Sequence, residues 1–260
     1  MTFLRSLLFN LAFFGITFAM TLAGTVVRLF NRDRVIDVAR LWARLVIASA
    51  RLFCGIRLEV SGLENLPPGP ALIASRHQSA FDTLVWLTLV PRCCYVLKRE
   101  LLRIPLMGQL MLDAGMIAVD RSGGASALRS LVRAGEQAAL DERQMVIFPE
   151  GTRADPGPPL PLQPGVAALA ARTNLPVVPA ITDSGHYWGR RAFRKKPGTI
   201  RIILLPPIGP GLKREALMDR LRHDLSMPLE AAGAGATGER FGQPTRPAEA
   251  ARSPVDNYVD

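Results

Sequence analysis

The sequence predicts an α/β fold, with a mixed sheet of about seven strands, flanking helices, and a preceding N-terminal membrane-associating helical segment. Three observations support this prediction. A long apolar segment begins the chain, and from residue 56 onward short β-rich runs alternate with longer helical patterns, which is typical of βαβ units. The length of 260 residues and the hydrophobic content of 48% are sufficient for one large domain with a sizeable core.

The first element is an uncharged run of 22 residues at 6–27, between Arg5 and Arg28. At about 1.5 Å per residue, a helix of this length crosses roughly 30 Å of hydrocarbon, so the run predicts a membrane segment. The polar Asn10 and three threonines leave partial insertion open. A cleaved signal peptide is disfavoured, because the basic region before the run is thin and the run is long.

The next element is a helix at residues 33–53, where charged side chains recur mostly at helical spacing. Two interpretations stay open, an interfacial helix and a soluble helix packed on the core. Three arginines, at 28, 32 and 34, follow the apolar run, whereas only Arg5 precedes it. By the positive-inside rule, this asymmetry predicts a cytoplasmic location for the domain that follows.

The central part of the chain supplies the strands and most of the helices. Seven runs rich in β-branched or apolar residues predict strands: IRLEV (56–60), ALIAS (71–75), CYVLK (94–98), MIAV (116–119), MVIF (145–148), PVVPAI (176–181) and IRIILL (200–205). Helical patterns lie between several of them, at 82–90, 99–113, 124–140 and 164–173. The expected organisation is N-terminal helices at 1–53, an α/β domain at 54–229, and a small, polar, disordered tail at 230–260.

Charge and cysteine content narrow the class of ligand. The net charge of +10 predicts a partner that carries phosphate, either nucleic acid or anionic lipid. The apolar N-terminus favours lipid, and the chain has no nucleic-acid-binding signature.

Three cysteines without C-x-x-C spacing, together with only three histidines, indicate neither a disulfide framework nor a zinc site. We expect no metal and no cofactor, and we interpret the compartment as reducing.

A histidine and an aspartate, His77 and Asp82, lie five positions apart where the ALIAS strand gives way to an apolar helix. On a continuous helix, positions five apart point about 140° away from each other, so the two side chains could not touch there. In a turn entering a helix they can, and Asp82 could then hold the imidazole Nδ1–H and leave Nε2 free as a base. The alternative is that Asp82 only caps the helix and His77 is a surface loop residue.

Two further stretches place polar groups at strand ends. PEGTR, at residues 149–153, follows the MVIF strand, and its proline stops the strand while its glycine lets another group approach the backbone. Arg153 offers a planar fork for phosphate or carboxylate, although a loop salt bridge with Glu150 would also explain it. GMIAVDR, at 115–121, places Asp120 and Arg121 at another strand end, and ligands bind at this edge of open α/β sheets.

Four blocks, His77-x4-Asp82, GMIAVDR, FPEGTR and LPVVPA (175–180), occur in this order and at these intervals. Together they resemble the glycerolipid acyltransferases, most closely the 1-acylglycerol-3-phosphate acyltransferases of bacterial membranes. The resemblance covers roughly residues 56–210 and departs from the family pattern at Arg76, where Asn is frequent, and at Gln163, where Lys is common.

The resemblance implies roles for individual residues. It implies that His77 is a general base oriented by Asp82, that Arg121 binds phosphate, and that Lys98 belongs to a further, less specific block. The acceptor site is implied to contain the EGTR residues: Glu150, Gly151, Thr152 and Arg153.

The resemblance also implies an enzyme of the bacterial inner membrane whose catalytic domain faces the cytoplasm. It would transfer an acyl group from acyl-CoA or acyl-carrier protein to a lysophospholipid acceptor, among membrane lipids and with no nucleic acid. Lysophosphatidic acid and a phosphate-free lyso-aminolipid both stay open as acceptors, as does a non-catalytic lipid-binding protein on the same scaffold. A serine hydrolase is disfavoured, because the chain has no G-x-S-x-G elbow.

Overall fold

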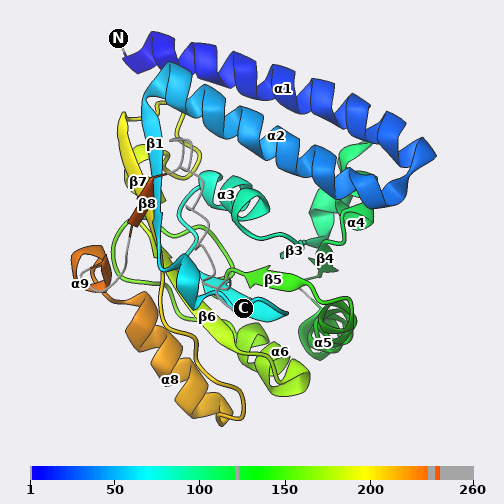
Figure 1. The fold of residues 1–260 in the computed structure, drawn as a ribbon, viewed down its shortest axis with the longest axis vertical. Helices are drawn as coiled ribbons and strands as arrows, with labels where there is room; N and C mark the ends of the chain where they lie inside the picture. The colour runs from blue at the N-terminus through cyan, green and yellow to red at the C-terminus, as the bar shows by residue number, and fades with distance from the viewer. Residues whose placement is uncertain (1, 121–122, 234–237, 241–260) are drawn as a thin grey trace, which may run out of the picture.

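One mixed sheet of eight strands organises the computed structural model, which describes residues 2–120, 123–233 and 238–240 (Figure 1). The strands are β1 (Ile56–Ser61), β2 (Ala71–Ser75), β3 (Cys93–Lys98), β4 (Ile117–Val119), β5 (Gln144–Ile147), β6 (Val177–Thr182), β7 (Gly198–Leu204) and β8 (Gly238–Arg240). The first seven confirm the strands predicted from the sequence. Their order across the sheet is β4-β3-β5-β2-β6-β7-β1-β8.

The direction of the strands explains where polar loops gather. Along the row β4-β3-β5-β2-β6 every neighbouring pair is parallel. The carboxyl ends of these strands therefore lie at one edge of the sheet, and the loops that follow them share that edge. Beyond this row, β6 pairs with β7 antiparallel, β7 with β1 parallel, and β1 with β8 antiparallel.

Successive strand residues point to opposite faces of the sheet, and each face carries its own core. On β2, Ile73 belongs to one hydrophobic cluster, whereas Leu72 and Ala74 belong to the other. On β5, Val146 faces the first cluster and Met145 the second. Near-continuous apolar strands such as ALIAS are thus explained, because both faces are buried under helices.

Nine helices surround the sheet in the described part of the chain: α1 (Thr2–Phe30), α2 (Val35–Ser49), α3 (Phe81–Leu89), α4 (Met107–Asp113), α5 (Gly124–Leu140), α6 (Gly165–Thr173), α7 (Ser184–Tyr187), α8 (Arg214–Leu225) and α9 (Leu229–Gly233). The helices predicted at 82–90, 124–140 and 164–173 are confirmed to within a residue. Helix α8 was not predicted, although Leu217, Leu221 and Leu225 recur at helical spacing and are buried.

The single helix predicted at 99–113 is wrong, because the chain forms two separate pieces there. A 3-10 turn spans Arg99–Arg103, and α4 begins only at Met107. Between them lies Pro105, whose ring disfavours helical backbone at the preceding residue. Ile104 is accordingly extended, with φ −68° and ψ 120°.

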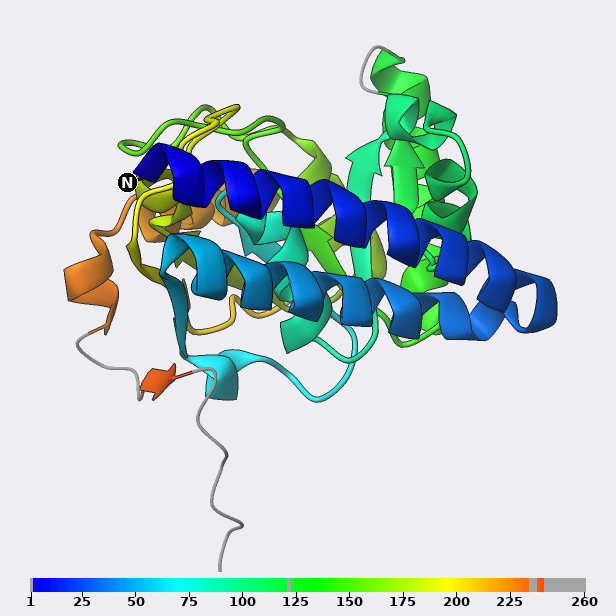
Figure 2. The same cartoon turned by 90° about the horizontal axis from the view of Figure 1, so that it is seen from above.

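The two N-terminal helices form a hairpin that lies along the sheet domain. Figures 1 and 2 show α1 and α2 side by side and antiparallel across one side of the molecule. The helix predicted at 33–53 is divided into a 3-10 turn at Arg32–Arg34, α2, and a π-helical turn at Ala50–Cys54 that ends at Gly55. Gly55 has a φ of 70°, a left-handed conformation that favours glycine.

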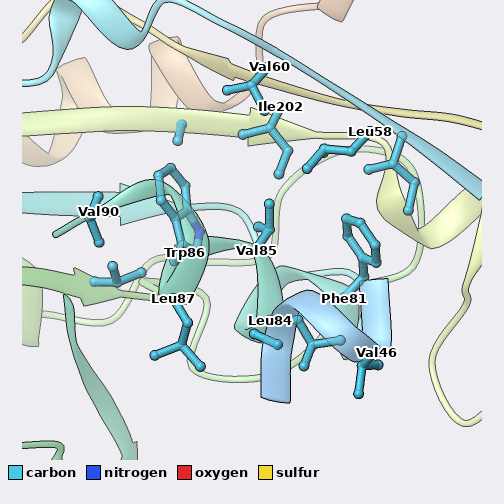
Figure 3. Close-up of a cluster of buried hydrophobic side chains, with 14 of the residues drawn as sticks. Val46, Leu58, Val60, Phe81, Leu84, Val85, Trp86, Leu87, Val90 and Ile202 are labelled. Atoms are coloured by element: carbon cyan, nitrogen blue, oxygen red, sulfur yellow. The ribbon is translucent and has the colours of Figure 1, made fainter. Parts of the chain in front are cut away.

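Helix α3 is the buried layer between this hairpin and the sheet. Its sequence, FDTLVWLTL, is apolar on nearly all sides, as expected for a helix covered by neighbours. Trp86 is fully buried, and its indole N–H donates to Ser75 Oγ at 3.3 Å. Figure 3 shows Phe81 and Trp86 packed in the cluster that includes Val46 of α2 and Ile202 of β7. This packing fixes the N-terminus of α3 against the sheet.

Two other predictions concern the tail and the cysteines. The disordered tail predicted at 230–260 is wrong for residues 230–233, which belong to α9, and for 238–240, which form β8. Residues 234–237 and 241–260 lie outside the described residues. Cys93 and Cys94 are buried without a disulfide, and burial raises the pKa of Cys94 to about 12. Both thiols therefore pack in the core.

Candidate active site

The parallel edge of the sheet brings most of the predicted site residues together. His77 follows β2, residues 150–153 follow β5, and Lys98 ends β3. His77, Lys98, Gly151, Thr152 and Arg153 line one cavity of about 490 Å³. Asp82 and Glu150 are not among its lining residues and lie buried behind His77. Arg121, predicted for the same edge, lies outside the described residues.

A single carboxylate oxygen organises the loop that carries His77. Asp82 Oδ2 lies 3.1 Å from His77 Nδ1, and it accepts the backbone N–H of Gln78 at 2.7 Å and of Ser79 at 2.8 Å. Asp82 is in the first turn of α3 and its side chain reaches back to the preceding loop. This geometry differs from an ordinary cap, in which a side chain before the helix accepts from N–H groups inside it.

The contact between His77 and Asp82 involves the Nδ1 atom of the ring and leaves Nε2 without a partner among these two side chains. A carboxylate oxygen that accepts hydrogen bonds at this position favours a ring proton at Nδ1 and a lone pair at Nε2. The ring also stacks on Phe148, with centroids 4.0 Å apart and planes 19° apart. His77 is held on its edge and on its face, and its side chain is only 11% exposed. A ring fixed in this way is suited to the predicted role of a positioned base.

Glu150 holds the backbone of His77. Its Oε2 accepts the His77 backbone N–H at 3.1 Å, and its Oε1 lies 3.5 Å from Arg76 Nε in a buried ion pair. The Arg76 guanidinium also donates to the carbonyl of Gly157 at 2.7 Å. The alternative of a loop salt bridge between Glu150 and Arg153 is wrong, because Glu150 pairs with Arg76 and Arg153 lines the cavity.

Gly151 makes the turn that connects these groups. Its φ is +71°, and its N–H donates to the carbonyl of Phe148 at 2.9 Å. A Cβ at this position would lie 3.1 Å from Gln163 Cγ, in addition to the strain of the left-handed backbone. A glycine is therefore required for the EGTR segment to turn back toward His77.

The cavity combines polar groups, including His77, Lys98 and Arg153, with a larger apolar wall. Much of that wall comes from three helices: Met20 and Gly24 of α1, Val38 and Trp42 of α2, and Leu110 and Met111 of α4. A volume of roughly 300–1,000 Å³ is usual for a small-ligand pocket, so the cavity is large enough for a lipid chain or a comparable group. The described residues contain no cluster of three His, Cys, Asp or Glu side chains that could hold a metal ion.

Sequence reasoning missed several residues of this site. Arg190 and Arg191 line the cavity, although neither was predicted as a site residue. The signal that could have identified them is their position after β6, whose carboxyl end lies at the same edge as that of β2. Phe148, which stacks on His77, was assigned to the preceding strand, and the partner of Arg76 was not predicted.

Comparisons with known proteins agree on one family. Residues 57–183 match the family model described as Acyltransferase. The 1-acyl-sn-glycerol-3-phosphate acyltransferase of Pseudomonas aeruginosa is 37% identical over 200 residues, which cover 77% of this chain and 76% of that protein. The alpha enzyme of the same name from Homo sapiens is 32% identical over 189 residues, covering 70% of this chain and 67% of that protein.

A solved structure shows the same fold. The crystal structure of the 1-acyl-sn-glycerophosphate (LPA) acyltransferase from Thermotoga maritima superposes with a TM-score of 0.69 and 21% sequence identity. The match covers 90% of this chain and 100% of that one.

We predict that ionisation of Glu150 lowers the stability of the folded state as pH rises. Burial raises the pKa of Glu150 above its ordinary value of 4.5, although the His77 N–H and the Arg76 charge oppose this effect. The folded state then holds the proton more tightly than the unfolded chain does. The protonated Glu150 carboxyl stabilises the folded state relative to the ionised one. This contribution is fully present below pH 4.5, the pKa of the group in the unfolded chain, and it is lost as the pH rises through the higher pKa of the folded state.

The measurement is the free energy of unfolding by denaturant in neutral detergent, across the acidic to neutral range. The stability of the native protein relative to Glu150→Gln should decrease with pH over that window and then level off. Glu142→Gln is the matched control, because Glu142 is exposed and pairs only with an exposed arginine in the described structure. A relative stability that increases with pH would contradict the prediction and show that Arg76 outweighs burial.

Proposed function

The chain belongs to the 1-acyl-sn-glycerol-3-phosphate acyltransferase family, and on this premise we propose that it acylates the free hydroxyl of 1-acylglycerol-3-phosphate to give phosphatidic acid. The observation that carries the proposal is the pairing of His77 with Asp82 at the polar end of a largely apolar cavity. An acyl transfer between a thioester and a lipid needs both a base and an apolar binding site.

In the proposed reaction, His77 Nε2 accepts the proton of the acceptor hydroxyl while the hydroxyl oxygen attacks the thioester carbonyl. The tetrahedral intermediate collapses and expels the thiolate. The thiolate accepts the proton from His77 and leaves as a thiol. Asp82 stabilises the imidazolium formed between these steps. A positioned base of this kind typically contributes about 10²–10⁴-fold to the rate, and no acyl-enzyme is needed.

Acyl-CoA and acyl-carrier protein are both suitable donors, because each presents the same thioester. We propose that the apolar walls from α1, α2 and α4 hold an acyl chain beside His77. Burial of each methylene contributes about 0.8 kcal/mol, so a long chain would be bound mainly by this surface. The reaction requires no cofactor, since the thioester is already activated toward attack.

The acceptor phosphate would bind to the cations at the polar end of the cavity. Arg153 is the first choice, because it is partly buried, lines the cavity with His77 and has a planar fork suited to phosphate. Thr152 lies beside it and could donate its hydroxyl. Lys98 also lines the cavity and pairs with Glu100 at 2.9 Å. Arg121 remains a proposed helper from the family resemblance.

We further propose that the protein binds the cytoplasmic leaflet of the bacterial inner membrane through the α1–α2 hairpin. Helix α1 is long and apolar enough to span a bilayer, but it packs lengthwise on α2 and also contacts α4. A helix held in this way can insert along the membrane plane without separating from its neighbours. Its exposed face carries an apolar row at helical spacing: Leu4, Leu8, Leu11, Phe14, Phe18 and Leu22.

His77→Ala should abolish acyl transfer, and Asp82→Asn should lower kcat by roughly 10²–10⁴-fold, because the amide no longer fixes the imidazole tautomer. The measurement is steady-state transfer of a labelled acyl group from oleoyl-CoA to 1-oleoylglycerol-3-phosphate. Binding to vesicles should be unchanged in both variants. Full activity of His77→Ala would eliminate the mechanism, and an inactive native protein that still binds lysolipid would favour a lipid-binding role.

Arg153→Lys should raise the KM for 1-acylglycerol-3-phosphate much more than the KM for the acyl donor, and Arg153→Ala should raise it further. Lysine keeps the charge but not the bidentate fork. The expected loss is about 1.5–3 kcal/mol, or roughly 10- to 150-fold in kcat/KM. Each substrate is varied in turn. An unchanged acceptor KM, or equal activity on a phosphate-free lyso-lipid, would instead support the lyso-aminolipid alternative.

The double variant Phe14→Asp/Phe18→Asp should float poorly with vesicles of phosphatidylethanolamine and phosphatidylglycerol. These rings are 67% and 68% exposed, and each would contribute about 1.5–3 kcal/mol on insertion. The native protein should stay bound in about 1 M NaCl, where the Debye length is only about 3 Å. Leu140→Asp, on α5, is the control for a charge at an exposed apolar position. Complete release of the native protein by salt would overturn the proposed insertion.

A further inference from the structure

The loop between α7 and β7 brings a second pair of cations to the cavity. Arg190 and Arg191 are exposed at the surface and also line the cavity that contains His77 and Arg153. The loop follows β6, which pairs in parallel with β2, so it begins at the edge of the sheet where the His77 loop begins. The two arginines therefore lie at the mouth of the proposed active site.

Contacts with α1 hold this loop in place. Lys195 is only 5% exposed, and its backbone N–H donates to Ser6 Oγ at 2.9 Å. Its ammonium group donates to Asn10 Oδ1 at 2.8 Å and to the carbonyls of Ala192 and Phe193. These bonds explain why an apolar helix carries Ser6 and Asn10. They also fix the loop against α1, so the location of the two arginines is defined.

A tight turn in the backbone of the loop carries the two arginines, and Arg190 contacts the Arg153 segment. Arg191 has a φ of 56°, a left-handed conformation that persists in a non-glycine residue only when its surroundings impose it. The Ala192 N–H donates to the carbonyl of Gly189 at 3.2 Å, which closes the turn. Arg190 Nη1 donates to the carbonyl of Arg153 at 3.3 Å and connects the two segments directly.

The charges in this region are not balanced by carboxylates. Arg153, Arg190 and Arg191 form no ion pair with an Asp or Glu side chain within residues 2–120, 123–233 and 238–240. Burial lowers the pKa of Arg153, Asp82 opposes this effect, and the charge of Arg190 adds to it. Like charges gathered around a cavity favour binding of an anion there.

We propose that Arg190 and Arg191 bind a substrate phosphate at the mouth of the cavity, in addition to the phosphate-binding role proposed for Arg153. This inference rests on the proposed function. Two substrates carry the required chemistry, the glycerol phosphate of the acceptor and the phosphates of the pantetheine-linked donor. The contact between Arg190 and the backbone of Arg153 places the pair beside the proposed acceptor site, and kinetics distinguishes the two sources.

The experiment compares Arg190→Gln, Arg191→Gln and their double variant with Arg194→Gln. Arg194 lies on the same loop and carries the same charge, but it sits over the ring of Phe3, 5.9 Å from its centroid, and does not line the cavity. It is therefore the matched control for loss of one positive charge. Each variant is assayed in neutral detergent with four substrates: 1-oleoylglycerol-3-phosphate, 1-oleoylglycerol, oleoyl-CoA and a truncated oleoyl thioester without phosphate.

Loss of either cavity arginine should raise the KM for the phosphate-bearing substrate roughly 3- to 10-fold. This effect lies between the contribution of an exposed ion pair and that of a charge-assisted hydrogen bond. If the acceptor phosphate is bound, the KM for 1-oleoylglycerol-3-phosphate rises and the KM values for both thioesters do not. If a donor phosphate is bound, the KM for oleoyl-CoA rises and the KM for the truncated thioester does not. In either case Arg194→Gln should keep the native kinetics.

The proposal is overturned if neither KM rises more in the cavity variants than in Arg194→Gln. It is also overturned if all three single variants lose vesicle binding equally while their KM values stay native, because the loop would then be a general electrostatic surface. Failure of the proposed function gives a different result. In that case the native protein itself would not transfer oleate to 1-oleoylglycerol-3-phosphate.

Discussion

The carboxylate of Asp82 is the constraint on which the geometry of this site depends. One oxygen accepts from the His77 ring and from two consecutive backbone N–H groups, and the residue is 1% exposed. A buried carboxylate without such donors would cost several kcal/mol, so these hydrogen bonds stabilise both the turn between β2 and α3 and the buried position of Asp82. The same oxygen contacts Nδ1 of His77 and so determines the orientation of the ring. The conformation of the loop and the orientation of the proposed base thus share a single cause.

A second carboxylate, Glu150, complements the first by holding the backbone of His77. Because it comes from the loop after β5, the histidine is positioned by two separate segments at the same sheet edge. Arg76 pairs with Glu150 in the interior, and this pairing explains how an arginine is buried next to His77. The acidic residue of EGTR supports His77 from behind, while Gly151 turns the chain so that Arg153 reaches the cavity.

The α1–α2 hairpin combines three physical roles because its faces differ. One face packs on α3 and closes the core, a second contributes the apolar walls of the cavity, and a third is exposed and apolar. Polar residues within it form specific contacts, as in the bond from the Trp42 indole N–H to Thr17 Oγ1 at 3.0 Å. Removal of the hairpin would therefore open the cavity as well as weaken membrane attachment, and point substitutions on the exposed face separate the two effects.

The strands, most of the helices and a possible contact between His77 and Asp82 could be predicted from the chain alone, because these features depend on short-range patterns. Runs such as ALIAS reveal burial on both faces, and the apolar segment after Asp82 marks the start of α3. The strand order, the packing of α1 along α2, the pairing of Glu150 with Arg76, and the hydrogen bond from Arg190 to the backbone of Arg153 became apparent only in the folded protein. These residues are far apart in the chain, so only packing of the helices on the sheet determines which loops meet.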